Sequence, residues 1–307
     1  MNNVYDMVVI GAGPAGCSAA LYASRAGLST VIVEKYAPGG QMALTGDIDN
    51  YPGFEEGVDG FTLGVKMHKS AERFGVKTEY CEITDVDFSG GIKKLTTSSG
   101  ELLAKTVVIA SGAKARELGV ENEKSLIGKG VHYCAHCDGN FYRNKTVAVV
   151  GGGNSAAADA LYLSRLAKKV YLIHRRDTLR ATKIYHEPLM KAENVEFLWN
   201  STVEEFLTEL RVKGVRIKDT VTGEKKDVLC DGVFVSIGRD PMTEFLKGAV
   251  ELDEKGYVVA DESTRTNVKG VFAAGDVRTK ALRQVVTAVS DGAVAVHFAE
   301  EYLNGQK

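Results

Sequence analysis

The chain has 307 residues, of which 44% are hydrophobic and 25% charged, and its formal net charge is −2. This length suffices for about two domains, and the composition is that of an ordinary globular protein. The small net charge argues against a nucleic-acid or membrane surface, and no apolar run approaches the roughly 18 residues of a membrane span.

The first elements follow each other in the order of a dinucleotide-binding unit. An apolar run over Val4–Ile10 predicts a buried parallel strand, Ala15–Ala26 a helix, and Thr30–Glu34 a second strand. Between strand and helix lies Gly11-x-Gly13-x-x-Gly16. Such glycines let the backbone approach a pyrophosphate, and the helix N-terminus supplies amide donors. An acid that ends the second strand, here Glu34, accepts hydrogen bonds from a ribose diol.

Cysteine usage separates one pair from the rest. Five cysteines are an odd number and too few for a secreted disulfide scaffold. Cys17, Cys81 and Cys230 stand alone, and we expect buried structural thiols. Cys134 and Cys137 form a Cys-x-x-Cys, whose thiols can exchange readily with a disulfide. Zinc is not expected because no second Cys-x-x-Cys supplies further ligands, and a purely structural disulfide is unusual in a cytosolic chain.

The strand–glycine–helix–strand pattern then begins again. Thr146–Val150 and Lys169–Ile173 read as strands and Asn154–Arg165 as a helix, with Gly151-x-Gly153-x-x-Ala156 at the turn. The second strand is followed by His174-Arg175-Arg176-Asp177 instead of an acid. Arginines at this position favour a 2′-phosphate, and therefore NADP over NAD. The alternative is a solvated basic helix start.

Three later strands end in small residues that suit a ligand crevice: Thr106–Ala110, Gly232–Ser236 and Gly270–Ala274. Asp276 follows the last of them as a candidate ligand residue or, alternatively, a helix N-cap. The final helix is predicted over Val285–Leu303. Because this tail is too short for a domain of its own, we expect it to complete the first unit. The second unit is then an insertion, joined by linkers near residues 113–118 and 239–246.

Taken together, these motifs resemble the low-molecular-weight, bacterial-type thioredoxin reductases, which are class II pyridine nucleotide-disulfide oxidoreductases. The resemblance covers essentially the whole chain and rests on motifs in a fixed order: residues 9–16, 39–41, 50–53, 134–139, 151–156, 174–177, 273–277 and 283–285. It implies an α/β fold of two Rossmann-like, three-layer ββα dinucleotide-binding domains, the second inserted into the first. Residues 1–115 plus 246–307 would bind FAD, and residues 116–245 would bind NADPH and carry the redox-active cysteines.

The implied site residues follow from matching motif positions. Those for FAD are Gly11, Gly13, Pro14, Ala15, Gly16, Glu34, Lys35, Gly39, Gly40, Gln41, Thr45, Asn50, Ile83, Ala110, Gly112, Gly275, Asp276, Arg283, Gln284 and Val285. Those for NADPH are Gly151, Gly153, Asn154, Ser155, Ala156, His174, Arg175, Arg176 and Arg180. The catalytic residues are Cys134, Cys137 and Asp138.

The resemblance also implies the activity, thioredoxin-disulfide reductase with NADPH as donor. Cys137 would face the flavin, Cys134 would attack the disulfide of thioredoxin, and Asp138 would serve as the acid–base group. No metal is expected. The inserted domain would rotate on its linkers during turnover, and the resemblance also implies a homodimer. A cytoplasmic location is expected, since the N-terminus does not read as a secretory signal.

Two positions depart from the family pattern. His136 stands where the family often has Thr, and Ala158 replaces the first of two consecutive glutamates. The alternatives are a related flavin disulfide reductase that serves another thioredoxin-like or peroxidase partner, or one that takes electrons from ferredoxin. Ferredoxin-reducing relatives lack the cysteine pair, and ferredoxin-driven ones should lose the Arg175-Arg176 site. A redox or nucleotide sensor would need an effector region, for which the sequence has no spare segment.

Overall fold

The chain folds into two units. In the computed structural model, which describes residues 4–44 and 47–305, one unit comprises Met1–Lys114 and Asp240–Lys307, and the other comprises Ala115–Arg239. The two crossing segments, β9 (Ala113–Ala115) and β18 (Arg239–Pro241), pair with each other as a two-stranded ribbon. The returning segment ends in the long helix of the first unit.

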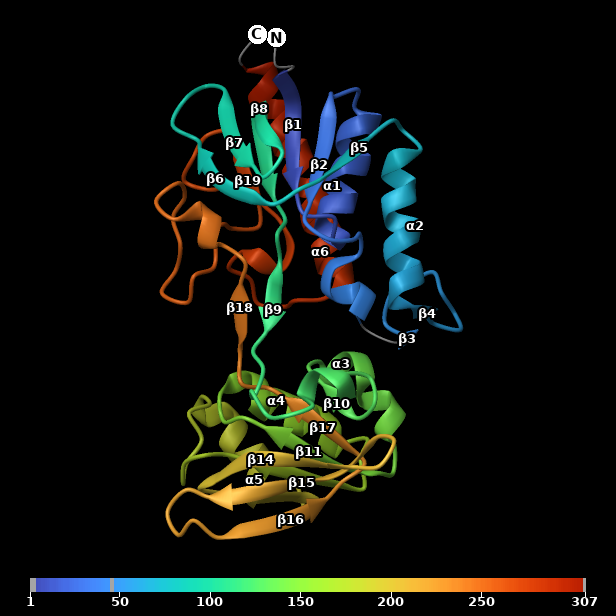
Figure 1. Ribbon diagram of the computed structural model, residues 1–307, viewed down its shortest axis with the longest axis vertical. Coiled ribbons are helices and arrows are strands. Elements are labelled where there is room, and N and C mark those ends of the chain that lie inside the picture. Colours follow the sequence, from blue (N-terminus) through green and yellow to red (C-terminus); the bar gives the residue numbers. More distant parts are fainter. Residues whose placement is uncertain (1–3, 45–46, 306–307) are drawn as a thin grey trace. The chain divides into compact units, whose positions relative to one another are not determined.

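The first unit is a three-layer α/β fold (Figure 1). Its sheet has the strand order β5-β2-β1-β8-β7-β6, and β19 also pairs with β8. Strands β1, β2, β5, β8 and β19 run parallel, whereas β6 and β7 are antiparallel. The elements are β1 (Val4–Ile10), α1 (Pro14–Arg25), β2 (Thr30–Glu34), η1 (Gly40–Leu44), β3 (Asp47–Ile48), β4 (Val58–Asp59), α2 (Gly60–Glu72), β5 (Lys77–Tyr80), β6 (Ile83–Asp87), β7 (Lys93–Thr97), β8 (Gly100–Ile109), η5 (Glu244–Leu246), β19 (Val271–Ala273), η6 (Gly275–Val277) and α6 (Val285–Asn304).

The second unit repeats the layered plan. Its parallel sheet has the order β10-β17-β11-β12-β13, and a separate antiparallel sheet has the order β14-β15-β16. The elements are η2 (Glu123–Leu126), β10 (Val131–His132), α3 (Ala135–Asp138), η3 (Gly139–Tyr142), β11 (Thr146–Val150), α4 (Asn154–Ser164), β12 (Lys169–Ile173), η4 (Lys183–Tyr185), α5 (His186–Lys191), β13 (Val195–Leu198), β14 (Ser201–Thr208), β15 (Val212–Asp219), β16 (Lys225–Leu229) and β17 (Gly232–Val235).

Alternation along the central strands builds the three layers, because successive side chains of a strand point to opposite faces. In β11, Val147 and Val149 pack in the cluster that contains the alanines of α4, whereas Ala148 and Val150 pack with the antiparallel sheet. In β1, Val9 packs in the cluster of α1 and α6, and Val8 lies in the cluster on the opposite face. Each parallel sheet is therefore apolar on both faces, as parallel sheets generally are.

The predicted element limits agree closely with the structure. The strands Val4–Ile10, Thr30–Glu34, Thr146–Val150 and Lys169–Ile173 have the predicted ends. The first helix differs from the prediction by one residue at each end, and the other two differ by one residue at the C-terminal end. The strand predicted from Thr106 begins earlier, at Gly100. Sequence patterning did not identify the antiparallel strands, whose mixed polar and apolar residues give a weaker signal.

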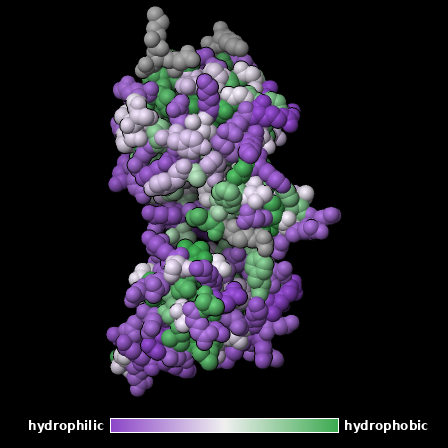
Figure 2. Space-filling model, turned by 45° about the vertical axis from the view of Figure 1, so that its right-hand side comes forward, coloured by the Kyte–Doolittle hydropathy of each residue, from purple (hydrophilic) through white to green (hydrophobic). Residues whose placement is uncertain are grey.

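The surface of the protein is mostly polar. Hydrophilic residues cover most of the face shown in Figure 2, with hydrophobic residues in small groups between them. In the described part of the chain, no helix has both the length and the hydropathy needed to cross a membrane.

Helices α1 and α6 approach so closely that Gly292 has no room for a side chain. A Cβ atom at Gly292 would lie 2.2 Å from the carbonyl oxygen of Ala15 and 2.8 Å from the amide nitrogen of Ala19. These obstacles are backbone atoms of α1 and cannot rotate away.

Gly292→Ala should therefore destabilise the protein by about 1–3 kcal/mol, the usual cost of overpacking. In an unobstructed helix the same change is stabilising by about 1 kcal/mol. Urea denaturation monitored by circular dichroism measures the sign. Ser290→Ala, an exposed position on the same helix, is the control and should change little. A more stable Gly292→Ala variant would contradict the close approach.

Candidate functional site

The first glycine turn brings bare backbone to the carboxyl end of the sheet. Gly11 has φ 101°, and a Cβ atom there would lie 2.5 Å from the oxygen of Ala110. A Cβ atom at Gly16 would lie 1.9 Å from the oxygen of Gly11, whereas the space beside Gly13 is open. No side chain from the described residues caps α1 at Gly13. The amides of the first turn of α1 are therefore free to bind a phosphate.

Glu34 lies next to this turn and is already oriented. Its Oε2 accepts a hydrogen bond of 2.8 Å from the amide of Ala12, and its Oε1 accepts one of 2.9 Å from the amide of Tyr36. Each carboxylate oxygen keeps a second lone pair, which can accept a hydrogen bond from a ribose hydroxyl. The residues present thus fit the adenosine end of a dinucleotide.

Other predicted flavin residues converge on the same turn. The amide of Gly39 donates to the carbonyl of Ala12 at 2.8 Å. A Cβ atom at Gly40 would contact the Cα of Gly13, and one at Gly275 would lie 2.9 Å from the Cβ of Ala15. The strand ends and loops that the sequence singled out therefore meet at one edge of the first sheet.

A second group of predicted residues forms contacts of its own. The side-chain amide of Asn50 donates to Oε1 of Gln284 at 3.0 Å, and Gln284 caps the start of α6. Nε of Arg283 donates to the carbonyl of Asp276 at 3.3 Å, and its guanidinium lies over the ring of Tyr257.

The other residues predicted to bind the flavin include Lys35, Ile83, Gly112 and Thr45. Lys35 pairs with Glu82 at the surface, with 2.6 Å between nitrogen and oxygen. Ile83 begins β6, and Gly112 lies in the loop after β8 with φ 77°. Thr45 lies outside the described residues. Asp276 lies within η6, whose N-cap is Ala274, so the alternative of a helix N-cap at Asp276 was wrong.

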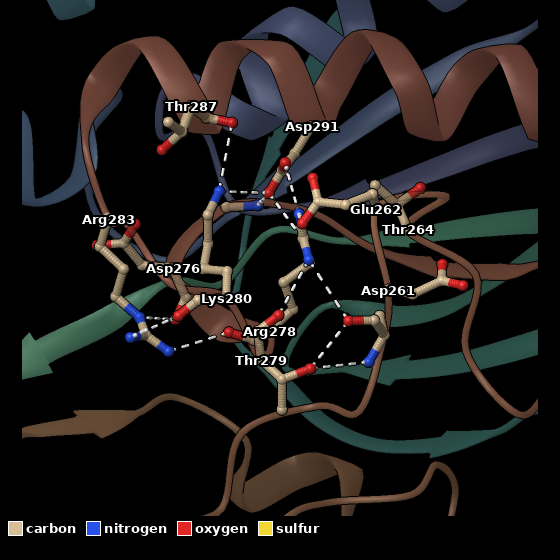
Figure 3. A network of polar contacts seen from close by, with 12 residues as sticks. Asp261, Glu262, Thr264, Asp276, Arg278, Thr279, Lys280, Arg283, Thr287 and Asp291 are labelled. Carbon is tan, nitrogen blue, oxygen red and sulfur yellow. Dashed lines mark hydrogen bonds and ion pairs between the residues drawn. The ribbon is translucent and has the colours of Figure 1, made fainter.

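A buried network of ion pairs, which the sequence did not predict, joins Arg278, Lys280 and Asp291 (Figure 3). Arg278 donates to both carboxylate oxygens of Asp291, at 2.9 and 3.0 Å, and Lys280 donates to Oδ2 at 2.8 Å. The side chain of Arg278 is 1% exposed, that of Lys280 is 4% exposed and that of Asp291 is 7% exposed. Oδ2 of Asp291 also accepts from the amide of Gly275 at 2.8 Å. The network therefore fixes the turn that carries Asp276.

The pKa of Asp291 reflects these partners. Burial by itself would raise the pKa, but the hydrogen bonds from Arg278 and Lys280 and from the amide of Gly275 outweigh it and hold the pKa below its ordinary value. Arg278, Lys280 and Asp291 are charged residues beside apolar stretches of the sequence. The sequence pattern does not show that their side chains are buried together.

The second glycine turn is closed from one side by His174. A Cβ atom at Gly152 would lie 2.2–2.4 Å from three atoms of the His174 ring. The ring is 3% exposed, and its Nε2 is the only buried side-chain nitrogen or oxygen of the described residues that lacks a hydrogen-bond partner. Burial, and then the charges of Arg180, Arg175 and Arg176, lower the pKa of His174. The orphaned nitrogen can bind a ligand group at this turn.

Arginines surround the same turn. The amide of Arg180 donates to the carbonyl of Gly152 at 2.7 Å. Arg175 and Arg176 are exposed, and among the described residues no carboxylate pairs with them. They lie in bends after β12 and not in a helix, so the alternative of a basic helix start was wrong. Arginines that lack a protein counter-ion beside a helix N-terminus fit a phosphate-bearing nucleotide.

The two motif cysteines form a disulfide. Cys134 and Cys137 are half-buried, and the amide of Cys137 lies 3.2 Å from Sγ of Cys134. The other cysteines, Cys17, Cys81 and Cys230, are buried free thiols, as predicted. Burial raises the pKa of Cys17 and of Cys230 to about 12, so these two stay protonated and unreactive.

His136, the unusual residue of the motif, lies at the surface. Its ring stacks on that of Tyr162 with centroids 4.3 Å apart, and its Nδ1 is 3.9 Å from Oδ1 of Asp159. Burial raises the pKa of Asp159, although Ser236 donates a hydrogen bond of 2.5 Å to it. Ala158, by contrast, carries no polar group that could replace the family's glutamate.

Known proteins match this arrangement over nearly the whole chain. The family model for the pyridine nucleotide-disulphide oxidoreductases matches residues 5–292. The thioredoxin reductase of Treponema pallidum is 45% identical over 304 residues, with 99% of each chain covered. That of Bacillus subtilis is 46% identical over 301 residues, covering 98% of this chain and 95% of the relative.

Solved structures agree. The thioredoxin reductase of Streptococcus pyogenes aligns with a TM-score of 0.93 at 44% identity, covering 99% of this chain and all of that chain. The thioredoxin reductase of Giardia duodenalis also gives 0.93, at 35% identity and the same coverage. The chain therefore belongs to the pyridine nucleotide-disulphide oxidoreductase family.

Asp291→Asn should lower the free energy of unfolding by about 3–5 kcal/mol at neutral pH, because it removes the buried carboxylate that Arg278 and Lys280 share and leaves Arg278 only the exposed Glu262. The pKa of Asp291 is depressed in the folded state. Its stabilisation is therefore complete above the ordinary pKa of about 4 and is lost as the pH falls through the folded value.

Urea denaturation at a series of pH values tests this, and the gap between wild type and variant should narrow below about pH 4. Glu262→Gln is the matched control, because Glu262 also contacts Arg278 but is 93% exposed. A constant gap across the pH range would contradict the role of the ionised carboxylate.

Proposed function

We propose that this member of the family is an NADPH-dependent flavoprotein that reduces the disulfide of thioredoxin through Cys134 and Cys137. The observation that carries the proposal is the Cys134–Cys137 disulfide in a unit that also contains a nucleotide turn. The relatives that match almost end to end are thioredoxin reductases. The cysteine pair speaks against a ferredoxin-reducing relative, and the arginines at the second turn speak against a ferredoxin-driven one.

Each glycine turn is assigned one cofactor. The first turn, with Glu34 as an acceptor for ribose hydroxyls, would hold FAD in the first unit. The second turn, with Arg175, Arg176 and Arg180, would hold NADPH, because guanidinium groups can bind the 2′-phosphate in a bidentate manner. When bound, FAD supplies the route by which the electron pair of NADPH reaches the disulfide.

The protein's own residues then carry out the exchange. In the reduced state the thiolate of Cys134 attacks one sulfur of the thioredoxin disulfide and forms a mixed disulfide. Cys137 attacks the sulfur of Cys134, the Cys134–Cys137 bond forms again, and thioredoxin leaves with both thiols reduced. Asp138 directly follows Cys137 and is the group assigned to move the proton in this step.

The setting of the reaction is also proposed. A substrate that must stay reduced, together with unpaired thiols at Cys17, Cys81 and Cys230, suits the reducing cytoplasm. The homodimer that the family resemblance implies stays a prediction, which sedimentation of the purified protein can test.

Cys134→Ser should still allow NADPH to bleach the flavin absorbance under anaerobic conditions, but it should abolish thioredoxin turnover, because the attacking sulfur is gone. Anaerobic titration with NADPH, followed by oxidised thioredoxin, measures both steps. Cys230→Ala, which removes a buried free thiol, is the control and should turn over normally. If the reduced wild-type flavin were not reoxidised by thioredoxin, the proposed function would be wrong.

Arg175→Ala and Arg176→Ala should each raise the KM for NADPH about 10- to 100-fold, the value of a hydrogen bond to a charged group. The KM for NADH should stay unchanged, since NADH lacks the 2′-phosphate. Steady-state kinetics with both nucleotides make the measurement. Arg165→Ala is the control, because this exposed arginine caps the far end of α4. Equal losses for both nucleotides would contradict the phosphate assignment.

A further inference from the structure

Asp138, which follows the disulfide in sequence, is one end of a chain of three buried polar side chains. Nδ1 of His132 is 3.1 Å from Oδ2 of Asp138, and its Nε2 is 2.7 Å from the hydroxyl of Tyr142. His132 and Asp138 are each 8% exposed, and Tyr142 is 3% exposed. All three belong to the second unit, on β10, α3 and η3 respectively. The function derived so far uses Asp138 but gives no role to the other two.

Packing holds the His132 ring in one orientation. The ring stacks on Phe234, with centroids 5.2 Å apart and planes at 26°, and meets Tyr142 edge-on at 5.3 Å. Tyr142 is itself confined, because a Cβ atom at Gly232 would lie 2.3 Å from its ring. With both rings fixed, Nδ1 of His132 faces Asp138 and Nε2 faces Tyr142.

The proton positions follow from the hydroxyl. Burial raises the pKa of Tyr142 to about 12, so the hydroxyl keeps its proton and can donate to Nε2 of His132. With Nε2 as an acceptor, Nδ1 of the imidazole carries a proton and donates a hydrogen bond to Asp138. The hydrogen bonds therefore run in one direction, from Tyr142 through His132 to the carboxylate.

This direction suits a carboxylate that acts as a base. Asp138 is tied to the cysteines through its amide, which donates to the carbonyl of Cys134 at 3.1 Å. His132 holds Oδ2, which leaves Oδ1 to exchange a proton. A hydrogen bond to the ionised form of a carboxyl group stabilises that form. Without His132, the carboxylate would lose both its orientation and this donor.

We propose that His132 is the positioning residue of the exchange reaction, holding the carboxylate of Asp138 in one orientation, and that Tyr142 fixes the tautomer of His132. This rests on the proposed function. In the step concerned, the Cys137 thiol gives its proton to Oδ1 of Asp138 and its sulfur attacks that of Cys134. The bond between Cys134 and thioredoxin breaks, and the departing thiolate takes the proton from Asp138.

Kinetics of the FAD-loaded enzyme test the proposal. His132→Ala should lower kcat with thioredoxin about 10-fold, part of the 10²–10⁴ that acid–base catalysis supplies. His132→Asn should restore most of the rate, because an amide N–H can replace Nδ1–H. Tyr142→Phe should fall between them. The other titratable and charged groups around Tyr142, namely Arg211, Cys230 and Asp231, are present in every variant.

A spectroscopic signature separates this role from a structural one. With ¹⁵N-labelled histidine, the Nδ1–H of His132 should give a downfield proton signal that Asp138→Asn shifts upfield and His132→Ala removes. His297→Ala, at an exposed histidine on α6, should leave the signal and the rate unchanged. The signal decides the point even if His132→Ala does not fold.

The outcomes distinguish the two proposals. Full activity in Asp138→Asn would remove the acid–base role from the proposed mechanism. A slow Asp138→Asn variant combined with a His132→Ala variant of wild-type rate would overturn the role of His132 and leave the proposed function intact. A His132→Asn variant as slow as His132→Ala would also overturn it, since the donor would then not be what matters.

Discussion

The close approach of bare backbone at the carboxyl ends of β1 and β11 is the constraint on which the rest of the structure depends. A Cβ atom would lie 2.5 Å from the oxygen of Ala110 at Gly11, and 2.4 Å from the oxygen of Ser236 at Gly151. Both turns thus press a helix N-terminus against the neighbouring strand end. Donors and a positive dipole end are thereby collected at one edge of each sheet, so the chemistry at these edges is largely backbone chemistry that side chains only refine.

The side chains around the two turns differ between the units, and this difference is the basis of the proposed assignment of the ligands. Around the first turn the added charge is an acceptor, Glu34, held by two amides. Around the second turn the added charges are guanidinium groups, beside a histidine kept neutral by its surroundings. A scaffold that binds any pyrophosphate becomes selective through the side chains at the end of its second strand. The selectivity therefore resides in few residues, while stability depends on many.

Local patterns were enough to predict most of the scaffold. The strand from Val4 and the glycine turn after it are defined by neighbours in sequence, so periodicity and turn chemistry identified them. The ion pair of Arg278 with Asp291 and the contact of His132 with Asp138 were not predictable, because both depend on burial that only the folded chain creates. The motif positions came from family resemblance, which identifies residues but says nothing of the contacts that hold them.

The groups that we propose to handle protons and sulfur all lie within one unit. Cys134, Cys137, Asp138, His132 and Tyr142 span a short stretch of chain from β10 to η3, and the rings of His132 and Tyr142 pack against Phe234 of β17. Their mutual geometry is therefore independent of where the other unit lies. A disulfide must be accessible to a protein substrate, yet the acid–base group beside it needs a constant environment. Placing the sulfurs half-exposed and the proton carriers buried meets both requirements within a few residues.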